Sequence, residues 1–473
     1  MQDHPYQEDK ENLSELLAQY ENLKNGRGAS FLTEESFEKL IDYFDEREEL
    51  TKALEAAELG TGQYPYSSSL TIKKADVLLG IRRYEEALQT LDKAALLDSR
   101  DINLYILKTD AFLALDQPEK AVDLLENALE KFSGEERIDL LFELADVYDD
   151  YEEFDKIFDC LKMILEDDPN NEEALYKICF WTDFTGRNEE SIKLHTQIIN
   201  EFPYNELAWF NLAAAYQGLK LYEKSIDAYQ YAVTIEEKFD YAYRNMADAY
   251  IKLRKYREAI EALQKVAELA KPEDLIYEAI GHCYDKMRNY AQARIHYRKA
   301  SHLNPGDSKL YYKIALTYFK EGQWQNACKQ LETALRIHHQ QAEYNLLMGE
   351  CKMQLGAFKE AIQYFSDAVV FRPKNTAGWE ALIRCLFKAG LFEECLEQVR
   401  TALQITAGKP VFYYYKSAVL FSLGRSKEAA VCLEEAIDKV PKMLKKFIEL
   451  NPSILQNTWV VDIIARSKRG KRR

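Results

Sequence analysis

The chain has 473 residues, and its 79 acidic and 62 basic side chains give a formal net charge of −17 at pH 7. On average such a surface repels nucleic acid and anionic lipid, so we expect neither as a main partner. The N-terminal sequence has no basic region followed by an apolar run, and no apolar stretch is long enough to span a membrane. We therefore expect a cytoplasmic protein without a membrane partner.

The first predicted element is an amphipathic helix near the N-terminus. Leucines and Tyr20 recur at helical spacing over residues 11–25, and Asn25-Gly26 is a typical helix end. Polar residues 1–10 predict a tail, and residues 26–30 predict a short loop. We interpret residues 1–33 as a tail and a helix that caps the structure after it; a detachable interaction motif is the alternative.

From residue 34 to residue 443 the sequence repeats with a period of 34 residues. Within a unit, apolar residues at helical spacing predict two antiparallel helices; in one unit Trp209, Leu212 and Tyr216 share a helix face. Two extra residues, Glu136 and Arg137, interrupt the period once. Twelve units fit it, starting at Glu34, Ser68, Ile102, Ile138, Glu172, Glu206, Asp240, Asp274, Ser308, Ala342, Thr376 and Pro410.

Alanine marks two positions of the unit. Counting from each start, position 20 is alanine in eight of the twelve units, and position 27 is also alanine in eight. Small side chains at fixed points predict a close helix crossing, because larger side chains there would push the two helices apart. Glycine recurs at position 15 and proline at position 32, where they end the first and the second helix.

This pattern resembles the tetratricopeptide repeat (TPR) family over residues 34–443. The eighth unit shows the family's residues most fully, with Tyr277, Ile280, Gly281, Tyr284, Ala293, Tyr297, Ala300 and Pro305. The resemblance implies an all-α fold, a right-handed superhelical solenoid in which twelve antiparallel helix pairs stack. The chain also looks like long bacterial TPR proteins that carry no catalytic domain.

After residue 443 the period ends, and residues 444–450 and 454–466 predict two helices separated by Asn451-Pro452. We interpret residues 444–466 as a cap for the open end of the stack. Residues 467–473 form a basic tail, and the last eight residues carry six basic groups. This tail is the weak exception to our expectation that the protein does not bind nucleic acid.

The family geometry places positions 2, 5, 6, 9, 12 and 13 of each unit on the inner face of the superhelix, and we call them the groove positions. They are not core positions, so the resemblance implies that they serve a partner. Aromatic side chains there would anchor a partner or else pack against the adjacent unit. Our candidate groove residues are Tyr176, Phe180, Phe210, Asn211, Arg244, Asn245, Asp248, His282, Lys309, Tyr312 and Lys313.

Part of this set resembles the clamp with which chaperone-binding TPR domains hold a terminal carboxylate. Arg244, Lys309 and Lys313 match the basic positions of that clamp. Asp248 and Ala279 stand where the clamp has its asparagines, so we do not expect a terminal carboxylate to be held there.

Two other patterns suggest peptide ligands. Asn211 and Asn245 both occupy position 6 of successive units and resemble a short asparagine ladder for an extended peptide backbone, because an amide both donates and accepts. The acidic stretch 139–153 is an alternative surface and would attract a basic peptide.

Catalytic and metal-binding patterns are missing from the sequence. It contains no phosphate-binding loop, dinucleotide fingerprint, nucleophile elbow or zinc-protease motif. The eight cysteines form no C-x-x-C pair, and six of them fall at repeat positions that favour small apolar side chains, so we interpret them as reduced core thiols. We predict no enzyme, no metal and no cofactor.

We therefore predict a non-catalytic scaffold or adaptor that binds a protein or peptide partner in its groove and supports complex assembly. One alternative is a small-ligand or enzymatic site inside the superhelix, around Arg244, Asp248 and His282. The other is a self-associating structural protein, in which the C-terminal cap and the helix over 11–25 form a homodimer.

Overall fold

The computed structural model describes residues 5–25 and 31–470, with side chains for residues 13–25 and 31–465. The loop predicted at 26–30, residues 1–4 of the predicted tail and residues 471–473 of the basic tail lie outside the described residues. The part that is described is all-α and has no strand, as predicted. The chain divides after Glu237 into two compact units.

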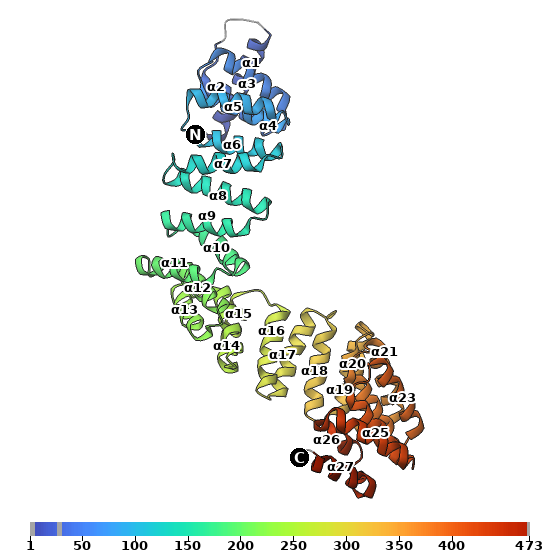
Figure 1. Ribbon diagram of the computed structural model, residues 1–473. Coiled ribbons are helices and arrows are strands. Elements are labelled where there is room, and N and C mark those ends of the chain that lie inside the picture. The colour runs from blue at the N-terminus through green and yellow to red at the C-terminus, as the bar shows by residue number, and fades with distance from the viewer. Residues whose placement is uncertain (1–4, 26–30, 471–473) are drawn as a thin grey trace. The chain divides into compact units, whose positions relative to one another are not determined.

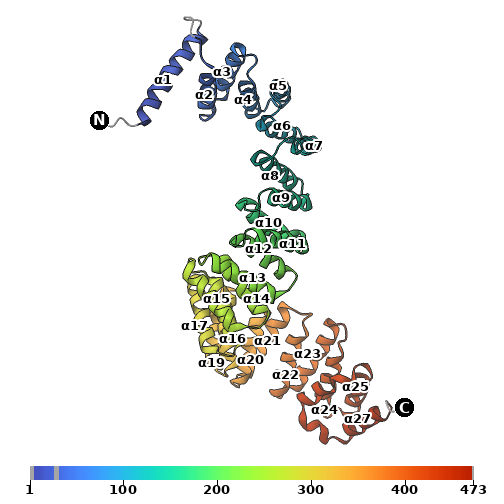
Figure 2. The ribbon, with the colours of Figure 1, turned by 90° about the vertical axis from the view of Figure 1, so that its left-hand side faces the viewer.

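In the first unit, helices follow one another in chain order and pack mainly against their neighbours (Figures 1 and 2). Its helices are α1 (Pro5–Lys24), α2 (Glu34–Asp45), α3 (Leu50–Gln63), α4 (Ser68–Gly80), α5 (Tyr84–Leu97), α6 (Ile102–Ala114), α7 (Pro118–Leu129), α8 (Glu135–Asp150), α9 (Phe154–Asp167), α10 (Glu172–Thr185), α11 (Asn188–Glu201), α12 (Glu206–Gly218) and α13 (Tyr222–Ile235).

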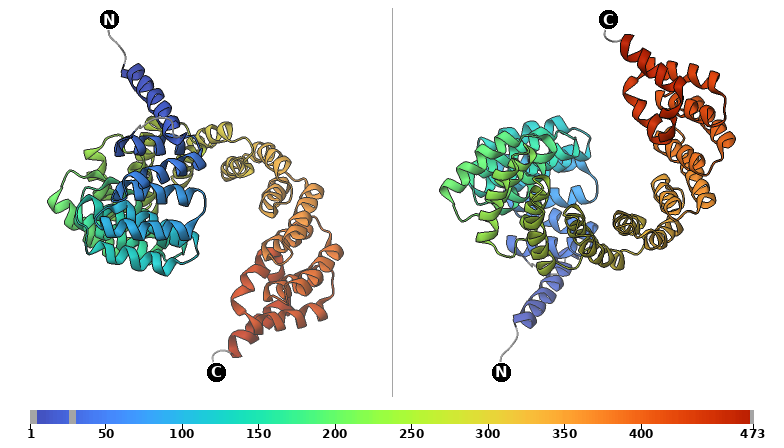
Figure 3. Two further views of the ribbon diagram at one scale, coloured as in Figure 1. Left: turned by 90° about the horizontal axis from the view of Figure 1, so that it is seen from above. Right: turned by 90° about the horizontal axis from the view of Figure 1, so that it is seen from below.

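The second unit is built in the same way, and two further views show its helices in chain order (Figure 3). They are α14 (Asp240–Lys252), α15 (Tyr256–Leu269), α16 (Asp274–Lys286), α17 (Tyr290–Leu303), α18 (Ser308–Lys320), α19 (Trp324–Ile337), α20 (Ala342–Gln354), α21 (Phe358–Phe371), α22 (Thr376–Lys388), α23 (Phe392–Ile405), α24 (Pro410–Ser422), α25 (Ser426–Lys439), η1 (Pro441–Met443), α26 (Leu444–Leu450), η2 (Pro452–Gln456) and α27 (Thr458–Gly470).

The two helices of a repeat cross closely because small residues stand at their contact. Ala293 and Ala300 of α17 are fully buried, as are the alanines at the same positions of most other repeats. Gly281 of α16 faces Tyr297 of the same helix α17, and a Cβ atom added at Gly281 would lie 2.7 Å from the ring of Tyr297. The predicted role of the alanines as close-packing residues is confirmed.

Helix ends follow from local backbone chemistry. Asn205 caps α12 by accepting a hydrogen bond from the backbone N–H of Ala208 at 2.8 Å, and Asp307 caps α18 in the same way through Lys309. At the C-terminal end of the first helix of each unit, all twelve residues at position 15 adopt the left-handed backbone conformation, with φ between 58° and 79°. Five of them are the predicted glycines, and the other seven are not glycine.

The pair formed by α10 and α11 departs from the repeat. α10 packs against α9 and α12 and makes little contact with α11, which packs against α12 instead. Ser191 and Ile198 of α11 occupy positions 20 and 27, where eight of the twelve units carry alanine. Residue size at these positions does not explain the departure, because the fourth unit has Ile157 and Ile164 there and its helices α8 and α9 still pack together.

Both ends of the stack are covered by helices outside the repeat. At the N-terminal end, Tyr20 of α1 is buried and its ring lies 5.7 Å from that of Phe44. At the C-terminal end, Phe447 and Val460 pack with Tyr414 in one cluster. The terminal helix α27 begins at Thr458, after the short helix η2, rather than at residue 454 as the sequence pattern indicated.

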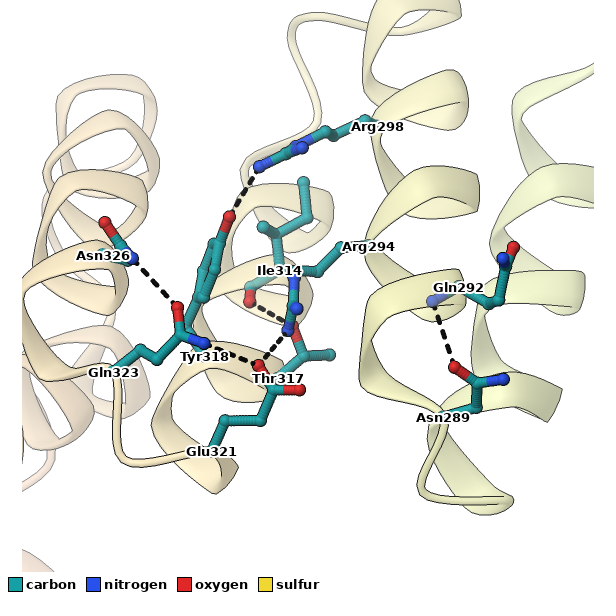
Figure 4. Close-up of polar contacts among 10 residues, drawn as sticks. All are labelled: Asn289, Gln292, Arg294, Arg298, Ile314, Thr317, Tyr318, Glu321, Gln323 and Asn326. Atoms are coloured by element: carbon teal, nitrogen blue, oxygen red, sulfur yellow. Dashed lines mark hydrogen bonds and ion pairs between the residues drawn. The ribbon is translucent and has the colours of Figure 1, made fainter.

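Polar side chains also join neighbouring repeats. Between α17 and α18, Arg294 forms an ion pair with Glu321 at 2.7 Å and lies over the ring of Tyr318 at 4.4 Å from its centroid. Arg298 donates to the hydroxyl of Tyr318 at 2.6 Å (Figure 4). Within residues 5–25 and 31–470, no helix is both long and apolar enough to cross a membrane.

The cysteines behave as the core residues that the sequence predicts. All eight are reduced, and seven are buried while Cys179 is half-buried. Burial raises the pKa of Cys283 to about 11 and that of Cys395 to about 12, so both thiols stay protonated.

Candidate functional site in the second unit

The second unit contains a pocket of about 540 Å³ that four of the predicted groove residues share. It lies over α16, α18 and the start of α20. We call it the basic pocket. Its lining residues are His282, Asp285, Lys286, Tyr297, Lys309, Tyr312, Lys313, Leu316, Lys320, Gln341, Glu343, Tyr344 and Arg372.

Helical spacing explains why α18 contributes most of one wall. Lys309, Lys313, Leu316 and Lys320 follow one another at intervals of three or four residues, and Tyr312 lies next to Lys313, so all five share one face of the helix. They occupy positions 2, 5, 6, 9 and 13 of the repeat. The core residues Leu310 and Ile314 lie on the opposite face and are buried, which fixes how α18 presents its polar face.

Aromatic rings form the floor of the pocket. Tyr312 and Tyr344 stack with their ring centroids 4.9 Å apart and their planes 25° from parallel. The hydroxyl of Tyr344 lies 3.0 Å from that of Ser308. Burial, and then the nearby Glu343, raises the pKa of Tyr312, so its hydroxyl remains a neutral hydrogen-bond donor.

The pocket carries an excess of positive charge, with five cationic and two acidic side chains in its lining. Lys320 forms an ion pair with Asp285 at 2.7 Å, Lys313 pairs with Glu278, and Arg372 pairs with Glu343. Among the described residues, Lys286 and Lys309 have no carboxylate within ion-pair distance. These two ammonium groups are available to an anionic ligand.

His282 contributes no charge of its own at neutral pH. Burial lowers its pKa, and the positive charges of Lys286 and Lys313 lower it further. The imidazole is therefore neutral at pH 7 and can donate or accept a hydrogen bond. A protonated imidazole would be repelled by the neighbouring lysines. His282 therefore offers a ligand a hydrogen bond and not a positive charge.

The charge of the pocket reflects the composition of its unit. Residues 1–237 contain 53 acidic and 23 basic side chains, a formal charge of −30, whereas residues 238–473 contain 26 acidic and 39 basic ones, a formal charge of +13. The average charge of the whole chain therefore describes neither unit. The second unit attracts anions although the chain as a whole is acidic.

The remaining predicted residues of the second unit lie outside the lining of the basic pocket. Arg244 forms a bidentate pair with Glu273, at 2.7 and 2.8 Å, which raises the pKa of the guanidinium and lowers that of the carboxyl group. Asn245 and Asp248 are half-buried on the same helix. The pocket thus includes His282 but neither Arg244 nor Asp248, its two companions in the predicted small-ligand site.

The predicted residues of the first unit fall into two groups. Tyr176 and Phe180 are strongly exposed on α10, at 64% and 61%. Phe210 is half-buried with its ring 5.6 Å from that of Tyr229. Asn211 is buried, and its amide nitrogen donates to the backbone carbonyl of Leu175 at 2.7 Å.

Several lining residues were not among the predicted ones. Lys286 and Lys320 occupy position 13, so their side chains could have been found from the repeat register. Tyr344 and Arg372 occupy positions 3 and 31, next to helix ends, and the register gives no signal for them. Within the described residues, no group of three or more histidine, cysteine or acidic side chains is placed to hold a metal ion.

Two family models match the sequence. A model described as the C-terminal ARM domain of tetratricopeptide repeat protein 21 matches residues 187–345, and a tetratricopeptide repeat model matches residues 342–375. The second match begins at Ala342, where the 34-residue period also starts a unit. The chain therefore carries tetratricopeptide repeats within residues 187–375.

Solved TPR structures resemble this chain at low sequence identity. The C-terminal part of a TPR repeat-containing protein from Cytophaga hutchinsonii has a TM-score of 0.43 and 16% identity, covering 54% of this chain and 98% of that one. YrrB, described as a TPR protein with an unusual peptide-binding site, has a TM-score of 0.35 and 17% identity, with coverages of 40% and 96%. The Cut9–Hcn1 hetero-tetramer of the APC/C has a TM-score of 0.34 and 12% identity, with coverages of 82% and 97%. No curated protein sequence matches the chain.

Proposed function

We propose that this TPR protein is a non-catalytic scaffold that binds an acidic segment of a protein partner in the basic pocket of its second unit. TPR-type repeat proteins typically mediate protein–protein interactions. The observation that supports the proposal here is the pair of lysines, Lys286 and Lys309, which have no acidic partner among the described side chains and line the same pocket as the stacked rings of Tyr312 and Tyr344.

This arrangement suits a peptide that alternates acidic and apolar side chains. The lysines would pair with its carboxylates, and the tyrosine rings would cover its apolar side chains while their hydroxyls donate hydrogen bonds. The neighbouring ion pairs keep Lys313, Lys320 and Arg372 in place, so a ligand would meet an ordered wall. Preorganisation of this kind lowers the entropy cost of binding.

A direct test uses a fluorescein-labelled decapeptide of alternating Glu and Leu, amidated at its C-terminus so that only side-chain carboxylates are tested. We expect saturable binding by fluorescence anisotropy, and loss of most of it when Gln replaces Glu in the peptide. The double variant K286E/K309E should weaken binding by about tenfold or more, because attraction at the two ammonium groups becomes repulsion.

The matched control is K329E/K359E, which makes the same charge change at two exposed lysines on the second helices α19 and α21 of the same unit. This variant should keep most of the affinity. Equal binding of the Glu and Gln peptides, or an equal loss in the two double variants, would contradict the assignment of the pocket. Tighter binding of a labelled single-stranded RNA than of the peptide would indicate that the basic pocket binds nucleic acid and not a protein partner.

A further inference from the structure

The first unit carries an exposed cluster of aromatic rings that the basic pocket does not involve. Phe154 at the start of α9 and Trp181 of α10 stack with their centroids 5.5 Å apart, and Phe184 meets Phe154 edge-on at 4.9 Å. Phe180 lies 5.0 Å from Trp181 and 5.9 Å from Phe184. We call these four residues the aromatic cluster.

The outer rings of the cluster are open to solvent. Phe180 and Phe184 are 61% and 56% exposed, and Tyr176, one turn earlier on the same face of α10, is 64% exposed. By contrast, Phe387 and Phe392, a ring pair at the turn between α22 and α23, are both half-buried. A contiguous exposed aromatic surface on a folded protein marks an interaction site more often than chance.

The packing of α10 explains how the cluster comes to be exposed. Tyr176, Phe180 and Phe184 occupy groove positions 5, 9 and 13. Because α10 packs against α9 and α12 rather than along α11, its buried residues, including Leu175 and Ile178, lie on its other faces. Phe184 also contacts Phe154 of α9, but more than half of its surface stays open to solvent.

Exposed acidic residues stand next to the aromatic cluster in the sequence. Asp149, Asp150, Glu152 and Asp155 are exposed within five residues of Phe154, and Asp183 is exposed and precedes Phe184. None of these five forms an ion pair with another described residue. They belong to a unit of formal charge −30, so the field over the cluster favours a cationic ligand.

The nearby lysines do not offset this charge. Lys156 pairs with Glu153 at 3.5 Å, and Lys177 pairs with Glu173 at 2.8 Å. Lys177 also lies over the ring of Phe142, 4.9 Å from its centroid. The same helix therefore already holds one cation against an aromatic face with a carboxylate beside it.

We propose that the aromatic cluster is a second docking surface and that it binds an arginine-containing basic segment of a protein partner. The guanidinium group is planar and stacks on aromatic faces while its N–H groups reach carboxylates in the same plane, which the compact ammonium group of lysine does less well. The exposed faces of Phe180 and Phe184 would receive the guanidinium groups, and the acidic side chains around Phe154 would pair with them. This surface acts independently of the basic pocket.

The test uses three fluorescein-labelled octapeptides of the same length and spacing, with four Arg, four Lys or four citrulline residues separated by Gly and Ser, at physiological salt. We expect the Arg peptide to bind most tightly, the Lys peptide several-fold more weakly and the neutral citrulline peptide not measurably. F180A/F184A should weaken binding of the Arg peptide by about tenfold, since two cation–π contacts are lost. The Arg peptide should also quench tryptophan fluorescence, and this response should be lost in W181F.

The control variant Y66A removes another exposed aromatic residue of the same unit, 85% exposed and outside the cluster, and should leave the affinity unchanged. Thermal unfolding checks that F180A/F184A keeps the fold. Equal binding of the Arg and Lys peptides together with no effect of F180A/F184A would show non-specific attraction to an acidic surface and overturn the proposal. Concentration-dependent dimerisation of the protein alone that F180A/F184A abolishes would instead identify a second copy as the occupant and would equally overturn it.

Discussion

At the scale of single residues, the turn between the two helices of a repeat carries backbone strain in most of the units. Position 15 is left-handed in all twelve units, and in Arg254 and Arg288 the φ angle is 60°. The turn is held by the N–H of Lys255, which donates to the carbonyl of Tyr250 at 2.9 Å. A side chain with a Cβ atom is strained in this conformation, and glycine is not.

Replacing Arg254 by glycine should therefore stabilise the protein by about 1 kcal/mol, because relief of strain outweighs the entropy that glycine costs. Arg254→Ala serves as the control, since it removes the same side chain but keeps the Cβ atom. Urea unfolding followed by circular dichroism measures both. A stability gain in the alanine variant equal to that in the glycine variant would show that the side chain, and not the backbone, was responsible.

Helix α11 differs from its counterparts at the scale of the element, because it buries a histidine. His195 is fully buried; its Nδ1 donates to the carbonyl of Ser191 at 2.8 Å, and its Nε2 has no partner among the described residues. Burial lowers the pKa of His195 to about 4. The ring therefore stays neutral in the folded state at pH values where the unfolded chain already takes up a proton.

This difference predicts a pH dependence of stability. Between pH 6.5 and pH 4 the unfolded state binds the proton more strongly, so stability should fall as the pH falls, by up to about 3 kcal/mol. His195→Leu should flatten this part of the profile, while His302→Leu, at an exposed position in α17, should leave it unchanged. Thermal unfolding at half-unit pH steps gives the comparison, and identical slopes in the wild type and His195→Leu would refute it.

The 34-residue period predicted most helices because each repeat buries the same positions of its two helices. From the sequence alone, the alanines at positions 20 and 27 predicted the close helix crossing, and the glycines at position 15 predicted the end of the first helix. The rearrangement of α10 could not be read from the repeat, because large residues at positions 20 and 27 leave the fourth unit's helix pair intact, and the alternative partner α12 is set by tertiary packing. The burial of Asn211 follows from that same contact, which the repeat register does not contain.

The candidate site was predictable to a similar extent. His282, Lys309, Tyr312 and Lys313 followed from the groove positions and meet in one pocket. Arg372 and Tyr344 come from helix ends, where a shift of one residue changes the direction of a side chain. Phe184 occupies a groove position and belongs to the aromatic cluster, yet its importance depends on contacts with Phe154 from the preceding repeat.

At the scale of the whole molecule, stability is distributed along the chain, because each repeat contacts mainly its neighbours. Charge is distributed unequally, with −30 in residues 1–237 and +13 in residues 238–473. The two proposed surfaces accordingly have opposite preferences. One chain would hold an acidic segment and a basic segment at the same time, which is the property required to bring two partners together.

The two proposals together predict that the protein binds the acidic peptide and the basic peptide at the same time. The affinity for the labelled Glu–Leu peptide, measured in saturating Arg peptide after correction for association of the two peptides in solution, should stay within about twofold of its value without it. K286E/K309E should abolish only the first interaction and F180A/F184A only the second. Mutual exclusion of the two peptides would mean that they compete for one surface.

The reactivity of the buried cysteine thiols can be used to measure local unfolding of the repeats. Cys160 and Cys179 lie in the first unit and six more, from Cys283 to Cys432, in the second. Alkylating reagents attack the exposed thiolate, so each of the seven buried cysteines would be tagged only while its repeat is open. Mass spectrometry of the tagged native chain would therefore rank the repeats by how often they open, without any introduced label.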